Sequence, residues 1–269
     1  MSEEIKNKFT PKKFVKNPIK GTKCTLMISS AKGGVGKSTF AVNLAFALQN
    51  IGKKVGILDA DIYGPSLPKI LGLNEKPKNE GGKFLVPLEK FGVQCISIGF
   101  LVDENTPMIW RGPMVISAIR TMTEKVLWKN LDFLIIDMPP GTGDAQLTFA
   151  QQIKIDGAII ISTPQDLALL DVKRGIQMFD KTGVKILGLI DNMSYFKGDD
   201  NKEYKIFGES GVERTAKEFN KEFLGHIPIH QDLRSSADNG HPLTHAEPNH
   251  EVSKIFKEIA KKIKDTNLV

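Results

Sequence analysis

The chain has 269 residues, of which 41% are hydrophobic and 25% are charged, and its formal net charge is +6. This length and composition are ordinary for a soluble globular protein with one large α/β domain. No apolar run approaches the ~20 residues that cross a bilayer, and the first residues lack the apolar core of a signal peptide. We therefore expect a cytoplasmic protein. Its two cysteines, Cys24 and Cys95, exclude a disulfide framework and are expected to be buried.

The first 22 residues are predicted to form a flexible basic tail. Residues 1–23 contain seven lysines against two glutamates, and they include Pro11 and Pro18. Such a tail could touch nucleic acid, an anionic membrane or an acidic partner, but a solvated tail without a specific partner is the favoured interpretation. Residues 23–269 are predicted to form a single domain, because no linker divides them.

Apolar runs alternate with helix-like patterns along that domain. The expected strands are 24–29, 54–59, 93–98, 133–137, 157–162, 184–190 and 223–227, and the expected helices are about 40–48, 113–129, 144–154, 167–181, 209–220 and 249–265. The strand-like runs are continuous, which is typical of strands covered on both faces. The alternation predicts a doubly wound, mostly parallel α/β sheet with helices on both faces. Residues 73–92 are expected to form a surface loop with a small hairpin, and 196–206 a polar excursion.

The most informative segment lies between the first expected strand and the first expected helix. Residues 30–39 read Ser-Ala-Lys-Gly-Gly-Val-Gly-Lys-Ser-Thr. Glycines let the backbone curl so that its N–H groups point at an anion, and the helix N-terminus adds partial positive charge. This context predicts a phosphate-binding loop in which Lys37 reaches the β- and γ-phosphates and Ser38 holds Mg²⁺. The expected nucleotide-binding residues of this loop are Lys32, Gly33, Gly34, Val35, Gly36, Lys37, Ser38 and Thr39.

Carboxylates follow two later strands, where ligands of such sheets bind. Asp137 ends a run of four apolar residues, as in the Walker B strand of P-loop enzymes, and is expected to hold the water shell of Mg²⁺. The alternative is an acid that caps the following loop. Asp59 and Asp61 end the second strand, and we assign Asp59 to the outer metal shell and Asp61 to orient the attacking water. By itself the Asp-x-Asp pattern is a weak signal.

The last fifth of the chain leaves two alternatives open. The expected helix 249–265 carries Val252, Phe256 and Ile259 on one face, which favours packing on its own sheet over a membrane-targeting role. All five histidines also lie there, and we interpret them as surface residues rather than a metal site.

Five further motifs carry a family resemblance. They are Leu58–Pro68 (LDADIYGPSLP), Trp110–Met114 (WRGPM), Asp137–Asp144 (DMPPGTGD), Thr163–Ala168 (TPQDLA) and Asn192–Phe196 (NMSYF). Together with the loop, whose Lys32 and missing first glycine match a "deviant" Walker A, they resemble the Mrp branch of the MinD/ParA superfamily from about residue 22 to residue 260. Members of that family are homodimeric, ATP-hydrolysing carriers or scaffolds for iron–sulfur clusters. The resemblance implies ATP and Mg²⁺ as cofactors, and apo iron–sulfur client proteins or assembly machinery as partners.

The resemblance also implies roles for single residues. Lys32 matches the signature lysine that crosses a dimer interface to the partner's nucleotide, so the expected catalytic residues are Lys32, Lys37 and Asp61. Asn192 matches the residue that reads adenine, and Pro228 is placed to line the other side of the base. Family members commonly place Cys-x-x-C after the Asn-Met-Ser-Tyr-Phe run, but residues 197–202 contain no cysteine. The resemblance thus allows an iron–sulfur cluster whose usual ligands this chain lacks.

Three functional hypotheses remain. We favour an ATPase that assists iron–sulfur cluster delivery, because the resemblance is long and the ATPase motifs are complete. A nucleotide-gated assembly adaptor without its own cluster is the second, favoured by the missing cysteines. A MinD/ParA-type positioning ATPase that acts on a membrane or DNA surface is the third.

Overall fold

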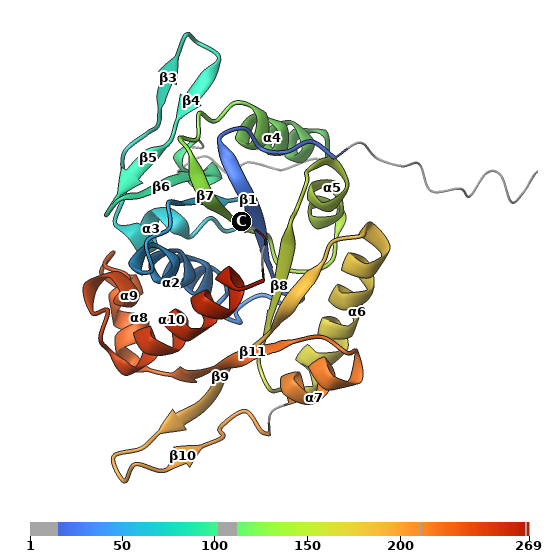
Figure 1. Cartoon of the computed structure of the whole chain (residues 1–269), viewed down its shortest axis with the longest axis vertical. Coiled ribbons are helices and arrows are strands. Elements are labelled where there is room, and N and C mark those ends of the chain that lie inside the picture. Colours follow the sequence, from blue (N-terminus) through green and yellow to red (C-terminus); the bar gives the residue numbers. More distant parts are fainter. Residues whose placement is uncertain (1–15, 102–111, 210, 267, 269) are drawn as a thin grey trace, which may run out of the picture.

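A nine-stranded sheet runs through the centre of the computed structural model, which describes residues 16–101, 112–209, 211–266 and 268 (Figure 1). Its strands follow the order β10-β9-β8-β1-β7-β2-β6-β5, and β11 pairs with β9. The strands are β1 (Thr22–Ser29), β2 (Val55–Asp59), β5 (Leu88–Lys90), β6 (Val93–Ser97), β7 (Leu131–Asp137), β8 (Gly157–Ser162), β9 (Ile186–Lys197), β10 (Glu203–Tyr204) and β11 (Phe223–Ile229). Only β5 and β10 pair antiparallel within the described sheet, so the expected mostly parallel α/β fold is confirmed.

Helices cover both faces of this sheet, as expected for continuous apolar strands. The longer helices are α2 (Lys37–Asn50), α4 (Gly112–Glu124), α5 (Asp144–Gln152), α6 (Asp166–Thr182), α7 (Gly211–Glu218), α8 (Gln231–Asp238) and α10 (Glu251–Lys264). In β1, Leu26 and Ile28 enter the core beneath α2 and α10, whereas Met27 enters the core beneath α4 to α7. The rings of Phe40 in α2 and Phe256 in α10 are 5.6 Å apart. The last helix therefore packs on its own domain, which is the interpretation that its sequence pattern favoured over a membrane-targeting role.

Short elements complete the fold where the sequence carried weaker signals. They are α3 (Leu67–Leu71), the 3-10 helix η1 (Ile98–Phe100), α9 (Leu243–Ala246) and the hairpin of β3 (Lys78–Glu80) with β4 (Phe84–Val86). The hairpin matches the expectation for residues 73–92, and it projects from one end of the molecule (Figure 1). Helices α3, α8 and α9 have eight residues or fewer and lacked a recognisable period. Helix α4 ends earlier than expected because Val126 bridges to Leu85.

Two expected boundaries need correction. Strand β9 continues to Lys197, because β11 pairs alongside it as far as Phe196, so Asn192 lies within a strand rather than after one. The packed domain also begins before residue 23. The Lys16 ammonium donates a hydrogen bond to the Thr182 carbonyl, and Ile19 is buried in the core. Of the expected tail, residues 1–15 lie outside the described residues, as do Trp110 and Arg111 of one family motif.

Among the residues that the structure describes, none of the helices combines the length and the apolar character needed to span a lipid bilayer.

Candidate functional site

The glycine-rich loop connects β1 directly to the first residue of α2. Gly34 and Gly36 have φ angles of 78° and 81°, in the left-handed region that favours glycine. A side chain at Gly36 would also collide with the amide nitrogen of Asn192. The expected strand, loop and helix therefore stand in the arrangement of a phosphate-binding loop, with Gly36 closing the turn before Lys37 begins the helix.

Lys37 places a buried positive charge at the centre of the site. Its side chain is 6% exposed, and its ammonium lies 2.5 Å from Asp137 Oδ1 and 3.7 Å from Asp61 Oδ2. The Ser38 hydroxyl accepts a longer hydrogen bond of 3.5 Å from the same ammonium. The structure thus brings together four of the predicted site residues, which come from α2 and from the ends of β2 and β7.

Asp59 and Asp137 face each other because β2 and β7 are neighbours, with these residues in register. The Asp59 carboxylate accepts hydrogen bonds from the backbone N–H groups of Asp61 and Leu67, at 3.1 Å each, and from the Ser97 hydroxyl at 2.9 Å. Burial, and then the neighbouring charge of Asp137, raise the pKa of Asp59 to about 7. The site is therefore rich in buried carboxylates that repel one another.

Asp61 differs from its neighbours in having a vacant acceptor. Burial raises the pKa of Asp61 above its ordinary value, and the positive charge of Lys37 acts in the opposite direction. Within the described part of the chain, its buried Oδ1 atom has no hydrogen-bond partner. A buried carboxylate oxygen without a donor is costly unless a ligand or cation completes it.

A separate cavity of about 390 Å³ opens beside the loop and contains the two predicted base-contact residues. Asn192 and Pro228 line it together with Gly36 and Thr39, and α8 forms its outer wall. The Asn192 amide donates a 2.7 Å hydrogen bond to the Val35 carbonyl. At the rim, Asp238 of α8 pairs with Lys69 of α3 at 3.5 Å.

Lys32 lies apart from these groups. Its side chain is exposed, and among the described residues no carboxylate lies within ion-pairing distance of it, while its carbonyl accepts a hydrogen bond from the Ser30 hydroxyl.

Two site residues carry no sequence motif of their own. The Ser97 hydroxyl donates a hydrogen bond to the Asp59 carboxylate and accepts one from the Gly99 N–H. The Gln146 side chain accepts a hydrogen bond from the Ser29 hydroxyl and donates one to the Pro139 carbonyl. A polar residue in an otherwise apolar strand end is the only signal that singles out Ser97. Gln146 follows the Asp137–Asp144 motif, but only the tertiary structure shows its partners.

The cysteines cannot supply thiolates to a surface-bound cluster in this conformation. Cys24 and Cys95 are both 0% exposed, as expected, and burial raises the pKa of each thiol to about 12. Residues 198–202, where the family motif would continue, instead form the tip of the β9–β10 hairpin.

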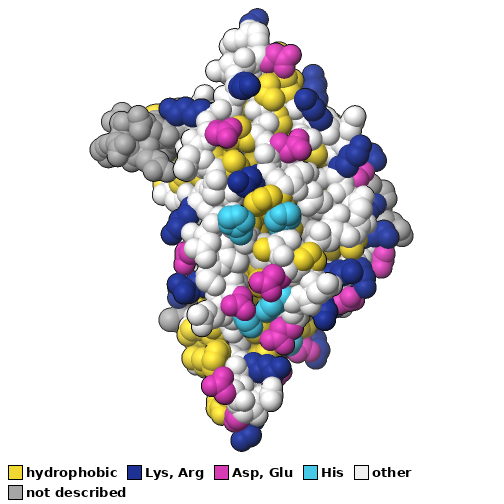
Figure 2. Space-filling model, turned by 90° about the vertical axis from the view of Figure 1, so that its left-hand side faces the viewer, with side chains coloured by type: hydrophobic (Ala, Val, Ile, Leu, Met, Phe, Trp, Pro, Cys, Tyr) yellow, Lys and Arg dark blue, Asp and Glu magenta, His cyan; other side chains and the backbone are white. Residues whose placement is uncertain are grey.

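Histidine side chains gather on the face formed by α8, α9 and α10, beside acidic side chains (Figure 2). His230, Asp232 and His250 have potential ligand atoms within 4.8 Å of one another. However, the Nδ1 atoms of both rings accept backbone N–H groups at the starts of α8 and α10. A neutral imidazole then carries its proton on Nε2, which leaves no lone pair for a metal. The geometry favours helix capping over metal binding.

The parallel sheet, the loop and the strand-end carboxylates define a P-loop NTPase of the MinD/ParA fold. The cell-division ATPase MinD from Pyrococcus furiosus superposes with a TM-score of 0.67 over 91% of this chain and 99% of that chain, at 21% identity, which supports the fold alone. A nucleotide-binding protein from Archaeoglobus fulgidus, solved in complex with ADP, superposes with a TM-score of 0.76 at 36% identity, covering 88% and 93% of the two chains.

Residues 21–264 match the model of the NUBPL iron-transfer P-loop NTPases within the ParA group, and the chain belongs to that family. The iron–sulfur cluster transfer protein NUBPL of Dictyostelium discoideum is 48% identical over 91% of this chain and 77% of its own length. The iron–sulfur cluster carrier protein of Escherichia coli K12 is 46% identical over 93% of this chain and 69% of its own length. The resemblance stated from the motifs is thus confirmed at the level of the family.

Proposed function

We propose that this chain binds and hydrolyses ATP with Mg²⁺ as a homodimer, and that it uses this cycle to assist delivery of iron–sulfur clusters to client apoproteins. The observation that carries the proposal is the buried Lys37 ammonium, held between Asp61 and Asp137 directly after the glycine-rich loop. An enclosed cation directly after a glycine-rich loop that opens a helix is suited to bind phosphate. Membership of the iron-transfer family supports the cluster-related part.

Lys37 would exchange its carboxylate partners for the β- and γ-phosphates when a nucleotide binds. Its ammonium is already desolvated in the free chain, so binding phosphate exchanges one charged partner for another instead of stripping water from an exposed lysine. Phosphoryl transfer depends mainly on positioning and charge stabilisation, which this lysine and the loop N–H groups would provide.

The carboxylates and Ser38 fit a divalent cation. Ser38, Asp59 and Asp137 would hold the ion and its water shell. The buried Oδ1 of Asp61 has no hydrogen-bond partner among the described residues, which fits a site that receives a cation or a hydrogen-bond donor. When bound, Mg²⁺ would neutralise phosphate charge. Asp61 would orient the attacking water, because its Oδ1 is an acceptor without a partner within the residues that the structure describes, while its Oδ2 lies 3.7 Å from the Lys37 ammonium.

Asn192 would favour adenine over guanine. Its Nδ2 is engaged by the Val35 carbonyl, so its Oδ1 remains as an acceptor at the cavity that it shares with Pro228. Adenine carries an amino donor at position 6, where guanine carries a carbonyl acceptor, and a fixed acceptor rejects the latter. Pro228 would contact the other face of the base.

Lys32 would act only in a dimer. It is exposed and unpaired by any described carboxylate, so its charge is available to the nucleotide of a second copy. A cation that arrives from the partner stabilises the transition state only when two subunits close.

Steady-state ATP hydrolysis with and without Mg²⁺ tests the enzymatic part of the proposal. Lys37→Ala should abolish turnover, whereas Lys54→Ala, which removes an exposed lysine at the opposite end of β2, should leave it unchanged. Turnover of Lys37→Ala at the rate of the unaltered chain would contradict the assignment.

An adaptor role without a resident cluster is the second candidate. It is favoured by one observation, the complete burial of both cysteines. Anaerobic reconstitution with iron and sulfide separates the two roles. A stable, stoichiometric cluster would support a carrier with unusual ligands, and its absence would support the adaptor.

A further inference from the structure

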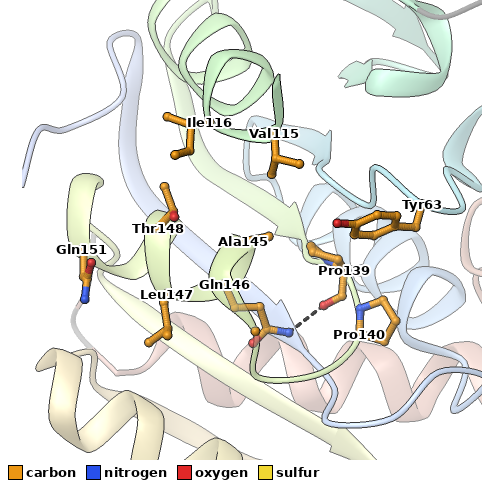
Figure 3. A pocket seen from close by; sticks show the side chains of 11 residues that line it. Tyr63, Val115, Ile116, Pro139, Pro140, Ala145, Gln146, Leu147, Thr148 and Gln151 are labelled. Atoms are coloured by element: carbon orange, nitrogen blue, oxygen red, sulfur yellow. Dashed lines mark hydrogen bonds between the residues drawn. The ribbon is translucent and has the colours of Figure 1, made fainter. Parts of the chain in front are cut away.

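Gln146 joins the end of β1, directly before the phosphate-binding loop, to the turn that follows Asp137. It lies in the first turn of α5 and is only 1% exposed. Its Oε1 accepts a 3.0 Å hydrogen bond from the hydroxyl of Ser29, the last residue of β1. Its Nε2 donates a 2.6 Å hydrogen bond to the carbonyl of Pro139, which is drawn in Figure 3. One side chain therefore connects three segments of the candidate site.

The Gln146 amide supplies a hydrogen-bond donor to a turn whose own backbone has few N–H groups. Residues 139 and 140 are prolines, which have no N–H group, and Pro139 is buried. The turn makes two further contacts with the strand and loop before it, from the Met138 N–H to the Ile28 carbonyl and from the Gly141 N–H to the Ser30 carbonyl. The Gln146 side chain links this packed turn to α5.

Helix α5 in turn forms one wall of a cavity of about 540 Å³. Tyr63, which is 69% exposed and follows Asp61 by two residues, lies on the opposite side with Val115 and Ile116 of α4 (Figure 3). The cavity is thus bounded by segments that directly follow two of the site carboxylates, and α5 is coupled to the site through Gln146.

We infer that Gln146 is a positioning residue that transmits the nucleotide state from the Lys37–Asp137 pair to α5. This inference rests on the proposed ATPase function. Nucleotide would draw Lys37 away from Asp137, and the turn beginning at Met138 would have to adjust. The hydrogen bonds from Gln146 to Ser29 and Pro139 fix the position of that turn relative to the end of β1. Because Gln146 belongs to α5, a movement of the turn would displace the start of α5 and with it the cavity wall.

The variant Gln146→Met tests this role because methionine keeps the length of the side chain but makes neither hydrogen bond. We expect kcat to fall at least about tenfold, because small misplacements of catalytic groups are costly, with nucleotide affinity changed less than about threefold. The matched control is Gln151→Met on the same helix, whose side chain lies at the far end of α5 from Pro139 (Figure 3). Ser29→Ala removes the other hydrogen bond, and adding it to Gln146→Met should lower kcat no further.

Hydrogen exchange of the backbone amides in residues 144–152 gives a second measurement that does not depend on turnover. A non-hydrolysable ATP analogue should change their exchange in the unaltered chain, and Gln146→Met should lose that response while Gln151→Met keeps it. Equal kcat for the two methionine variants, or no response of these amides in a chain that binds the analogue, would overturn the role of Gln146. An unaltered chain that does not bind ATP would instead refute the proposed function on which this role depends.

Discussion

Replacing Lys37 by methionine should strongly destabilise the nucleotide-free chain, because it leaves buried carboxylates without their cation. The side chains of Lys37 and Asp137 are 6% and 3% exposed, so this pair is a buried one rather than a surface salt bridge of about 0–1 kcal/mol. Removing one partner of a buried pair costs about 3–5 kcal/mol. For a domain of this size, that corresponds to a fall in the melting temperature of roughly 10 °C.

Replacing Asp137, the partner of Lys37, should lower the free energy of unfolding less than replacing Lys37 does, because the site holds more carboxylates than cations. Three buried carboxylates, Asp59, Asp61 and Asp137, share this site with one ammonium, and the charge of Asp137 raises the pKa of Asp59. Asp137→Asn removes one of the repelling charges and leaves Lys37 with Asp61 at 3.7 Å. We therefore expect Asp137→Asn to cost at least about 2 kcal/mol less than Lys37→Met, and the double variant to recover part of the loss of Lys37→Met.

Urea unfolding at neutral pH without nucleotide or divalent ions measures these free energies of unfolding, with Lys54→Ala as the surface control. The reasoning is refuted if Lys37→Met lies within about 1 kcal/mol of the unaltered chain, the range of an exposed pair. It is also refuted if Asp137→Asn is the more damaging of the two, since the carboxylates would then not be in excess.

Three further predictions address Lys32, recognition of the base and the two buried cysteines. Lys32→Ala should reduce ATP turnover but preserve most nucleotide affinity, measured by titration calorimetry, and an equal loss of both would argue against action across a dimer. The unaltered chain should bind ATP roughly tenfold or more tightly than GTP, as expected when one hydrogen bond is mispaired, and Asn192→Ala should narrow that ratio; an unchanged ratio would remove Asn192 from base recognition. Because the pKa of Cys24 and Cys95 is raised to about 12, both thiols stay protonated at pH 8. The thiolate fraction there is about 10⁻⁴, against about one quarter for an ordinary cysteine, so iodoacetamide should label them only in denaturant, and labelling of the native chain by mass spectrometry would contradict their burial.

The sequence by itself determined the features that depend on neighbouring residues. The glycines at 34 and 36, the strand before them and the helix after them act within a few residues, so the phosphate-binding loop could be predicted with Lys37 in place. Continuous apolar strands likewise indicated a sheet covered on both faces, and the absence of cysteine from residues 197–202 is visible without any structure.

Only the tertiary structure decided how distant segments meet. The strand order places β7 between β1 and β2, which sets Asp137 opposite Asp59 and within reach of Lys37, 100 residues earlier in the chain. The pairing of β11 with β9 brings Asn192 to the Val35 carbonyl, and the short helix α8 completes the cavity beside it. Gln146 likewise contacts Ser29 and Pro139 because β1 and β7 are neighbouring strands. Such contacts depend on sheet order and packing, which local residue patterns do not encode, and they determine which groups share one buried site.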